Sequence, residues 1–331
     1  MVHHLKPLDT LTQQAKRRRL TSLAKNALEN YDLQVTQIRF FRQETNTLFR
    51  LITSAGESLV LKIYSEDSTA QENLAEVTWL NALSRESEIQ VAAPVPRRDG
   101  QFLTHAHVDG IPGIHRCVLF HWVPGRPLIQ HMTPNNYFDL GKTVATLHKH
   151  AQIFNLPQDI HPKRWDQVFY YPAEPIVYHE KQYQHLFPPE RVTLLDQVVN
   201  EANVFLSSLY HNDQPPILIH GDLNPWNIHI FHKQIYVLDF EDVLLGYPIQ
   251  DIAILLYYEQ DHPNFQDLVK AFKKGYCLTL AWPVESQRQL ETLWAARRAM
   301  FVNYVAHTDP DPEQFIESRC VLLQTFLDCV G

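Results

Sequence analysis

The chain has 331 residues, of which 45% are hydrophobic and 20% are charged, so it can bury a large core and is long enough for one two-lobed domain or two ordinary domains. Its net charge of −8 argues against a nucleic-acid-binding protein, which needs a basic surface. No stretch approaches the ~20 apolar residues of a membrane-spanning helix, the start of the chain lacks the apolar core of a signal peptide, and the four cysteines show no CxxC spacing. We therefore expect a protein of a reducing, cytoplasmic setting, with no nucleic-acid or membrane partner and no zinc site.

The first third of the chain predicts a small sheet with two helices. Apolar residues at helical spacing predict a helix between about 10 and 31, with the basic run Lys16–Arg19 on its solvated face. Short apolar and β-branched runs, separated by turn residues, predict strands at 35–41, 48–52, 59–64, 101–105 and 116–123. A second helix is predicted at 70–84. We therefore divide this part into an N-terminal helical extension, 1–33, and an N-lobe, 34–123.

The turn Pro124–Pro127 interrupts this pattern, and most of the remaining chain has helical periodicity. The periodicity predicts helices at 140–151, 195–209, 249–258, 265–280 and 286–306, and a last one that ends near 329. Short apolar runs between them predict strands at 217–219, 228–231 and 235–238. We therefore expect a larger, mainly helical C-lobe over 124–331, and an α+β fold for the whole chain.

The segment 217–253 contains the residues with a chemical signature. Phosphoryl transfer needs a carboxylate beside the acceptor hydroxyl, and oxygen ligands for magnesium. A loop with Asp222 and, five positions later, Asn227 supplies a base and an amide ligand from one turn. The two strands that follow form a hairpin, which returns Asp239 to the same place directly after an apolar strand. The spacing therefore predicts a phosphotransfer site built from one short segment.

The sequence HGDLNPWN at 220–227, followed by LDFE at 238–241, resembles the catalytic core of the aminoglycoside phosphotransferase and choline kinase family. The resemblance extends over about residues 35 to 305 and implies the bilobal, protein-kinase-like fold of that family. It also implies that Asp222 is the catalytic base, and that Asn227 and Asp239 bind Mg²⁺ with ATP as the phosphoryl donor. His220 is expected to hold the catalytic loop, and Asp251 to brace it.

The same resemblance assigns phosphate-binding residues to the N-lobe. Lys62 corresponds to the lysine that contacts the α and β phosphates, and Glu76 on the next helix to the glutamate that pairs with it. Glu72 lies one turn earlier on the same face and is the alternative partner. Asn46 and Thr47 lie in the turn that covers the phosphates, where this chain has no glycine.

The stretch Phe120–Gly125 resembles the hinge of the family, whose backbone meets adenine, so His121 and Val123 are the expected nucleotide contacts. Trp226, inside the catalytic loop, either forms a wall of the acceptor site or packs on the C-lobe. The segment Arg164–Asp166 lies where the family often places its acceptor-binding helices.

We therefore predict a kinase that transfers the γ-phosphate of ATP to a hydroxyl of a small molecule. One alternative is a protein Ser/Thr kinase of the stress-response type, and another is a nucleotide-binding pseudokinase that acts as a scaffold. The negative net charge is compatible with a cationic acceptor. The acceptor itself and the oligomeric state stay open at this point.

Overall fold

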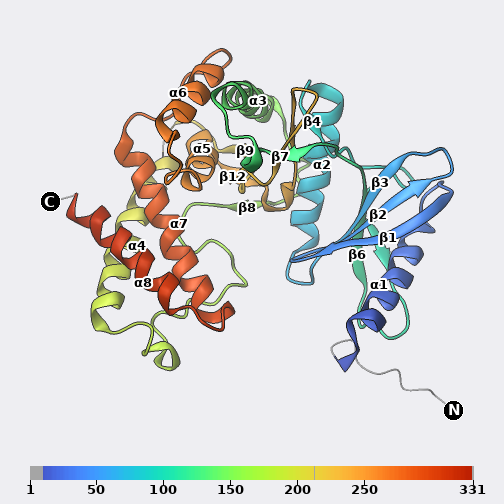
Figure 1. Ribbon diagram of the computed structural model, residues 1–331, viewed down its shortest axis with the longest axis horizontal. Coiled ribbons are helices and arrows are strands. Elements are labelled where there is room, and N and C mark those ends of the chain that lie inside the picture. The colour runs from blue at the N-terminus through green and yellow to red at the C-terminus, as the bar shows by residue number, and fades with distance from the viewer. Residues whose placement is uncertain (1–9, 212, 330–331) are drawn as a thin grey trace. The chain divides into compact units, whose positions relative to one another are not determined.

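The computed structural model describes residues 10–211 and 213–329. Residues 1–9 of the predicted extension, and with them the prediction that the chain start is not a signal peptide, lie outside the described residues. The described chain forms two compact units. The first contains residues 10–126, 156–161 and 229–241, and the second contains residues 127–155, 162–228 and 242–329. Strands dominate the first unit and helices dominate the second (Figure 1). The prediction of an α+β fold is confirmed.

The first unit is organised around a five-stranded antiparallel sheet, in the order β1-β2-β3-β6-β5. Its strands are β1 (Val35–Gln43), β2 (Thr47–Thr53), β3 (Ser58–Ile63), β5 (Thr104–Ala106) and β6 (His115–His121). Successive residues of a strand point to opposite faces of its sheet. Leu61 and Ile63 of β3 therefore join the buried apolar cluster on one face, while Lys62 between them is directed to the other face.

Helix α1 (Gln13–Leu28) covers the apolar face of this sheet. It begins after Thr12, whose hydroxyl accepts a hydrogen bond from the N–H of Ala15 at 3.3 Å and so satisfies one of the open donors of the first turn. The buried residues of the helix, which include Leu23, share one apolar cluster with the strands. On its exposed side, the guanidinium of Arg17 lies 4.6 Å from the centre of the Phe40 ring. Helix α1 therefore belongs to the core of the first unit.

Helix α2 (Ala70–Glu86) begins with a capping box, in which Thr69 and Glu72 each bond to the backbone of the other. Trp79 of this helix meets Phe240 edge-on at 5.4 Å, so the late segment 229–241 is packed into the first unit. That segment contains all but the first residue of β10 (Ile228–Phe231) and the whole of β11 (Gln234–Val237), which are joined by a two-residue turn with positive φ at both positions. A small sheet results, in the order β4-β11-β10-β7, with β4 (Gln90–Val91) and β7 (Arg126–Pro127) at its edges.

The second unit is a group of helices around a short sheet (Figure 1). The helices are α3 (Pro134–Ile153), α4 (Pro189–Tyr210), α5 (Pro248–Tyr257), α6 (Phe265–Tyr276), α7 (Gln287–Thr308) and α8 (Glu313–Asp328). The sheet has the order β8-β12-β9, from β8 (Lys163–Arg164), β12 (Leu244–Gly246) and β9 (Ile217–Ile219). Helices α3 and α6 pack very closely, because a Cβ atom at Gly141 would lie 2.1 Å from the Phe272 carbonyl oxygen and one at Gly275 would lie 2.0 Å from that of Phe138.

The elements differ from the predicted ones in a few places. Helix α6 ends at Tyr276 rather than at 280, because the chain turns back there and Trp282 packs edge-on against Tyr276 at 5.6 Å. The strand predicted at 101–105 is β5, Thr104–Ala106. Strands β4, β7, β8 and β12 were not predicted, since two or three residues show no period; β9 is equally short and was predicted only from its apolar run. Among the helices that the structure describes, none has the length and apolar character needed to cross a membrane.

Candidate active site

The predicted catalytic loop lies in the second unit, between β9 and β10, and its side chains bond mainly to one another. Asn224 Nδ2 donates to Asp222 Oδ2 at 2.6 Å, and Asn227 Nδ2 donates to the same oxygen at 3.1 Å. Asn224 Oδ1 in turn accepts the backbone N–H groups of Trp226 and Asn227, at 2.9 and 3.1 Å. The loop is therefore a closed turn that fixes the Asp222 carboxylate. The predicted base and the predicted amide ligand lie together in it.

Asp251, in the first turn of α5, holds the backbone at the start of this loop. Its carboxylate is fully buried and accepts the backbone N–H groups of His220 and Gly221, both at 2.9 Å, and His148 Nε2 lies 3.1 Å from Oδ2. Burial acts to raise the pKa of Asp251, but the hydrogen bond and charge of His148 outweigh it, so the pKa lies below its usual range. The carboxylate is therefore ionised and accepts from Nε2 of His148, whose Nδ1 lies 3.0 Å from the Tyr276 hydroxyl.

Two further features shape the loop. Gly221 has a φ of +79°, and a Cβ atom there would lie 2.1 Å from the Asp242 carbonyl oxygen, so only glycine fits. His220 is fully buried, and its Nδ1 lies 3.3 Å from the Asp222 backbone N–H, which donates to it. The structure thus places His220 as a buried support that touches the backbone of the loop.

Arg297 of α7 is a member of this cluster that sequence reasoning missed. Its Nη2 lies 2.8 Å from Asp222 Oδ1 and 2.8 Å from the Tyr258 hydroxyl, and its side chain is almost fully buried. On the sequence alone, Arg297 and Arg298 look like an exposed pair on a surface helix. The available signal is that they interrupt an apolar stretch, from Leu293 to Val302, in which nearly every residue is buried.

The aromatic side chain of the loop, Trp226, lies beside the same cluster. It is half exposed, and its ring meets that of Tyr258 edge-on at 5.4 Å. Packing on the helical unit is thus present in part, while the predicted wall of the acceptor site stays a prediction. On another side of the cluster, Asp242 accepts from Lys163 Nζ at 3.2 Å and from the Tyr171 hydroxyl at 2.8 Å.

The first unit carries a second polar cluster, centred on Lys62. Its Nζ lies 3.0 Å from Glu76 Oε1, 3.4 Å from Asp239 Oδ1 and 3.2 Å from Glu241 Oε2. Burial acts to lower the pKa of Lys62, but the three carboxylates more than offset it, so the pKa is raised and the ammonium stays charged.

The partner of Lys62 is Glu76 and not Glu72. Glu72 Oε2 accepts the Thr69 backbone N–H at 2.7 Å and so serves the capping box of α2. Glu76, one turn further on, is buried and also accepts the Tyr64 hydroxyl at 2.8 Å. Helical periodicity alone allowed either glutamate to pair with Lys62. The capping box decides between them, because it occupies the Glu72 carboxylate.

Asp239 and Asn46 complete this cluster. Asp239 follows β11 with a φ of +59°, a conformation that aspartate tolerates better than most residues. Asn46 lies in the turn between β1 and β2, donates through Nδ2 to Glu241 and accepts the Ser65 backbone N–H at 2.9 Å. Thr47 is buried at the start of β2. Of the residues predicted to bind phosphate, Lys62 and Glu76 thus form the centre of this cluster, and Asn46 reaches it through Glu241.

The predicted hinge residues lie at the end of β6. The N–H of His121 donates to the Ala93 carbonyl at 2.9 Å, and the N–H of Trp122 donates to the Ser58 carbonyl at 3.1 Å. The His121 imidazole is exposed and pairs with Glu57 at 3.1 Å, whereas Val123 is buried. The side chain of His121 therefore points away from the core, so any nucleotide contact of this stretch depends on its backbone.

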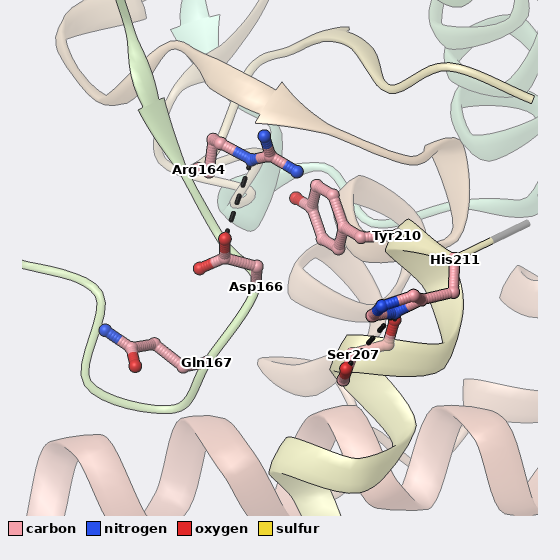
Figure 2. A pocket seen from close by; sticks show the side chains of 6 residues that line it. All are labelled: Arg164, Asp166, Gln167, Ser207, Tyr210 and His211. Atoms are coloured by element: carbon pink, nitrogen blue, oxygen red, sulfur yellow. Dashed lines mark hydrogen bonds and ion pairs between the residues drawn. The ribbon is translucent and has the colours of Figure 1, made fainter.

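A polar pocket of about 540 Å³ lies elsewhere in the second unit, and Figure 2 shows the six side chains that line it, Arg164, Asp166, Gln167, Ser207, Tyr210 and His211. Arg164 pairs with Asp166 at 3.5 Å and stacks over the Tyr210 ring at 4.7 Å. Its strand neighbour Lys163 instead meets Asp242, and successive residues of a strand face opposite ways. The pocket therefore opens on the other side of β8 from Asp242, and it does not include Asp222.

Comparison with known proteins identifies the family. A family model described as "Phosphotransferase enzyme family" matches residues 37–289. The amicoumacin kinase of Bacillus subtilis is 22% identical over 262 residues, which are 76% of this chain and 74% of the relative. An amicoumacin kinase solved with AMP-PNP and Ca²⁺ superposes with a TM-score of 0.76, at 20% identity, over 95% of this chain and 96% of that one. A microcompartment-associated aminopropanol kinase superposes with a TM-score of 0.73, at 20% identity, over 93% and 98%.

These similarities confirm the predicted family and the predicted kinase-like fold, and the names of these relatives are those of small-molecule kinases rather than of protein kinases. The match to the family model covers most of the chain and includes the residues of both polar clusters except Arg297. Arg297 lies beyond its end. The chain belongs to the phosphotransferase enzyme family and is a kinase of the small-molecule type.

Proposed function

We propose that this kinase transfers the γ-phosphate of ATP to the hydroxyl of a small, amine-bearing alcohol, with Asp222 as the catalytic base. The observation that carries the proposal is the Asp222 carboxylate, which is held at Oδ2 by Asn224 and Asn227 and at Oδ1 by Arg297. A carboxylate fixed in this way can orient an acceptor hydroxyl and take its proton as the phosphoryl group transfers.

The first unit is assigned to the nucleotide. Lys62, positioned by Glu76, contacts the α and β phosphates, while Asn46 and Thr47 cover them. Since the N–H groups of His121 and Trp122 are already used within the sheet, adenine is assigned to the carbonyl of His121 and the N–H of Val123. The second unit, with Asp222, is assigned to the acceptor.

The donor set suits Mg²⁺, which prefers oxygen ligands and usually takes only one or two carboxylates from a protein. Asn227 directs its Nδ2 end to Asp222, so its Oδ1 points away from that carboxylate. Asp239 offers a partly exposed carboxylate. We assign Asn227 and Asp239 as the residues that hold the ion, which, when bound, neutralises charge on the phosphates. Asp251 and His220 keep Asp222 in place by holding the backbone of the loop.

Two observations support an amine-bearing acceptor. Aminopropanol, named for one of the similar structures, carries both an amine and a hydroxyl. Trp226 presents a half-exposed ring next to the loop of Asp222, and an aromatic face attracts an ammonium group. The four cysteines are free thiols, two of them exposed, which suits the reducing, ATP-rich cytoplasm assigned to the enzyme.

The test is transfer of label from Mg-ATP to pooled acceptors, with amino alcohols, hydroxy amino acids, aminoglycosides, sugars and a generic protein in separate pools. The Asp222→Asn variant runs beside the wild type. We expect label in an amine-containing pool with the wild type only, and none after EDTA until Mg²⁺ is restored. Equal labelling by Asp222→Asn would remove Asp222 from its role. Label only in the protein pool would overturn the small-molecule acceptor, and ATP binding without any transfer would favour a scaffold.

A further inference from the structure

Arg297, which contacts Asp222 Oδ1, is a buried cation from a helix far along the chain from the loop. It lies in the middle of α7, is 5% exposed, and has its Nε atom buried without a hydrogen-bond partner among the residues that the structure describes. Removing a charge from water is costly unless the charge is paired. An arginine at such a position is therefore held by specific contacts, and those contacts indicate its purpose.

The contacts of Arg297 converge on the catalytic carboxylate. A single nitrogen, Nη2, lies 2.8 Å from Asp222 Oδ1 and 2.8 Å from the Tyr258 hydroxyl. The rings of Phe301 and Tyr258 flank the guanidinium carbon, at 4.9 and 5.3 Å from their centres. Burial acts to lower the pKa of Arg297, but Tyr258 and Asp222 more than offset it, so the guanidinium stays charged. The aromatic rings limit its movement, and the charge attracts the carboxylate.

The effect on Asp222 follows from its other partners. Asn224 and Asn227 hold only Oδ2, and both lie in the same loop as Asp222. Arg297 comes from a helix far along the chain and holds the other oxygen, Oδ1, so it adds a contact that the loop itself does not supply and ties the loop to α7.

We propose that Arg297 is the positioning residue of the catalytic carboxylate, anchored by Tyr258 so that Asp222 keeps one orientation for the acceptor hydroxyl. The inference rests on the proposed role of Asp222 as the base. The proposal includes no contact between Arg297 and ATP. It also expects Arg297 to affect the stability of α7 only as much as any other buried residue does.

The neighbouring residue provides the matched control. Arg298 is also largely buried on the same helix, but its Nη2 bonds to Gln260 at 2.6 Å and not to the loop. Arg297→Met and Arg298→Met therefore remove the same buried charge from adjacent positions of one helix. Thermal melting of both variants separates a loss of fold from a loss of positioning.

The experiment measures kcat and KM with Mg-ATP and 1-amino-2-propanol as the probe acceptor, and intrinsic hydrolysis of Mg-ATP with water as the acceptor. We expect Arg297→Met to lower kcat by about 100-fold, with the KM for Mg-ATP changed less than about twofold, since only the orientation of the base is lost. Arg298→Met should stay within about threefold of the wild type in both constants. Arg297→Lys, which keeps a cation, should recover at least about tenfold over Arg297→Met.

The decisive comparison is made in the Asp222→Asn background. A residue that acts only through Asp222 has nothing to position there, so Arg297→Met should cause no further loss. An equal loss in both backgrounds, or an equal loss from Arg298→Met, would overturn the proposal. If Asp222→Asn itself keeps full turnover, the proposed function fails instead, and the two failures are thereby distinguished. A crystal structure of Arg297→Met gives a readout independent of turnover: a rotated Asp222 carboxylate is expected, and an unmoved one contradicts the proposal.

Discussion

Replacement of Asp251 by Asn is the sharpest test of how the catalytic loop is held. The fully buried carboxylate receives two backbone N–H groups at 2.9 Å and one imidazole nitrogen at 3.1 Å. In the variant, one oxygen becomes an NH₂ group that faces a backbone N–H instead of accepting from it. Losing the charge weakens each remaining hydrogen bond by about 1 kcal/mol, and the blocked donor adds a further penalty of about 1–3 kcal/mol. We therefore expect a loss of about 3–5 kcal/mol in the free energy of unfolding of the second unit.

The assay is urea unfolding of the wild type and the variant across pH. Because the folded-state pKa of Asp251 is lowered, its contribution is fully present above the unfolded pKa of about 3.9 and is lost as pH falls through the folded value. The difference between the two proteins should therefore be constant from pH 5 to 8 and shrink below about pH 4. Asp139→Asn, at a half-buried residue of α3, is the control and should change stability by less than about 0.5 kcal/mol. An Asp251→Asn protein within about 1 kcal/mol of the wild type at pH 7 would refute the reasoning.

Three further predictions concern other parts of the two units. Burial raises the pKa of Glu259 to about 8, so this group keeps a proton in the folded state that it loses on unfolding. The wild type should therefore lose stability as pH rises from about 5 to 8. In melts across pH, the stability of Glu259→Gln should decline less steeply over this range. Trp226→Ala should raise the KM for an amine-bearing acceptor by about tenfold and leave that for Mg-ATP unchanged in steady-state kinetics, because an open aromatic face is lost; an unchanged acceptor KM contradicts the assignment. Lys62→Met should weaken ATP binding by about tenfold or more in calorimetry, since it removes the one cation among three carboxylates; affinity equal to that of the wild type argues against phosphate contact.

The sequence was informative for those site residues that lie close to one another along the chain. The loop from His220 to Asn227 and the carboxylate of Asp239 could be found because their spacing is fixed by one loop and one hairpin. Most strands and helices with a clear period were also predicted to within about four residues, whereas α3 and α4 begin at Pro134 and Pro189, six residues before the predicted helices. In these places local propensity and the final packing favour the same structure.

What the sequence did not indicate depends on contacts between distant segments. Arg297 contacts Asp222 although 75 residues of chain separate them, and the sequence of α7 alone does not show that this arginine is buried. The choice between Glu72 and Glu76 depends on the cap of α2, a feature that helical periodicity does not record. The segment Arg164–Asp166 stays a prediction for the acceptor site; Lys163, directly before it, meets Asp242, whereas Arg164 lines a separate pocket.

The return of segment 229–241 to the first unit has a consequence for protein engineering. A chimera made by one splice near Pro124–Pro127, where the sequence suggests a linker, would transplant the five-stranded sheet without β11, Asp239 and Glu241. Lys62 would then keep only Glu76 of its three carboxylates, and Trp79 would lose Phe240. Exchange of the first unit between relatives therefore requires at least two grafted pieces of gene, one of which carries the hairpin and the residues that follow it.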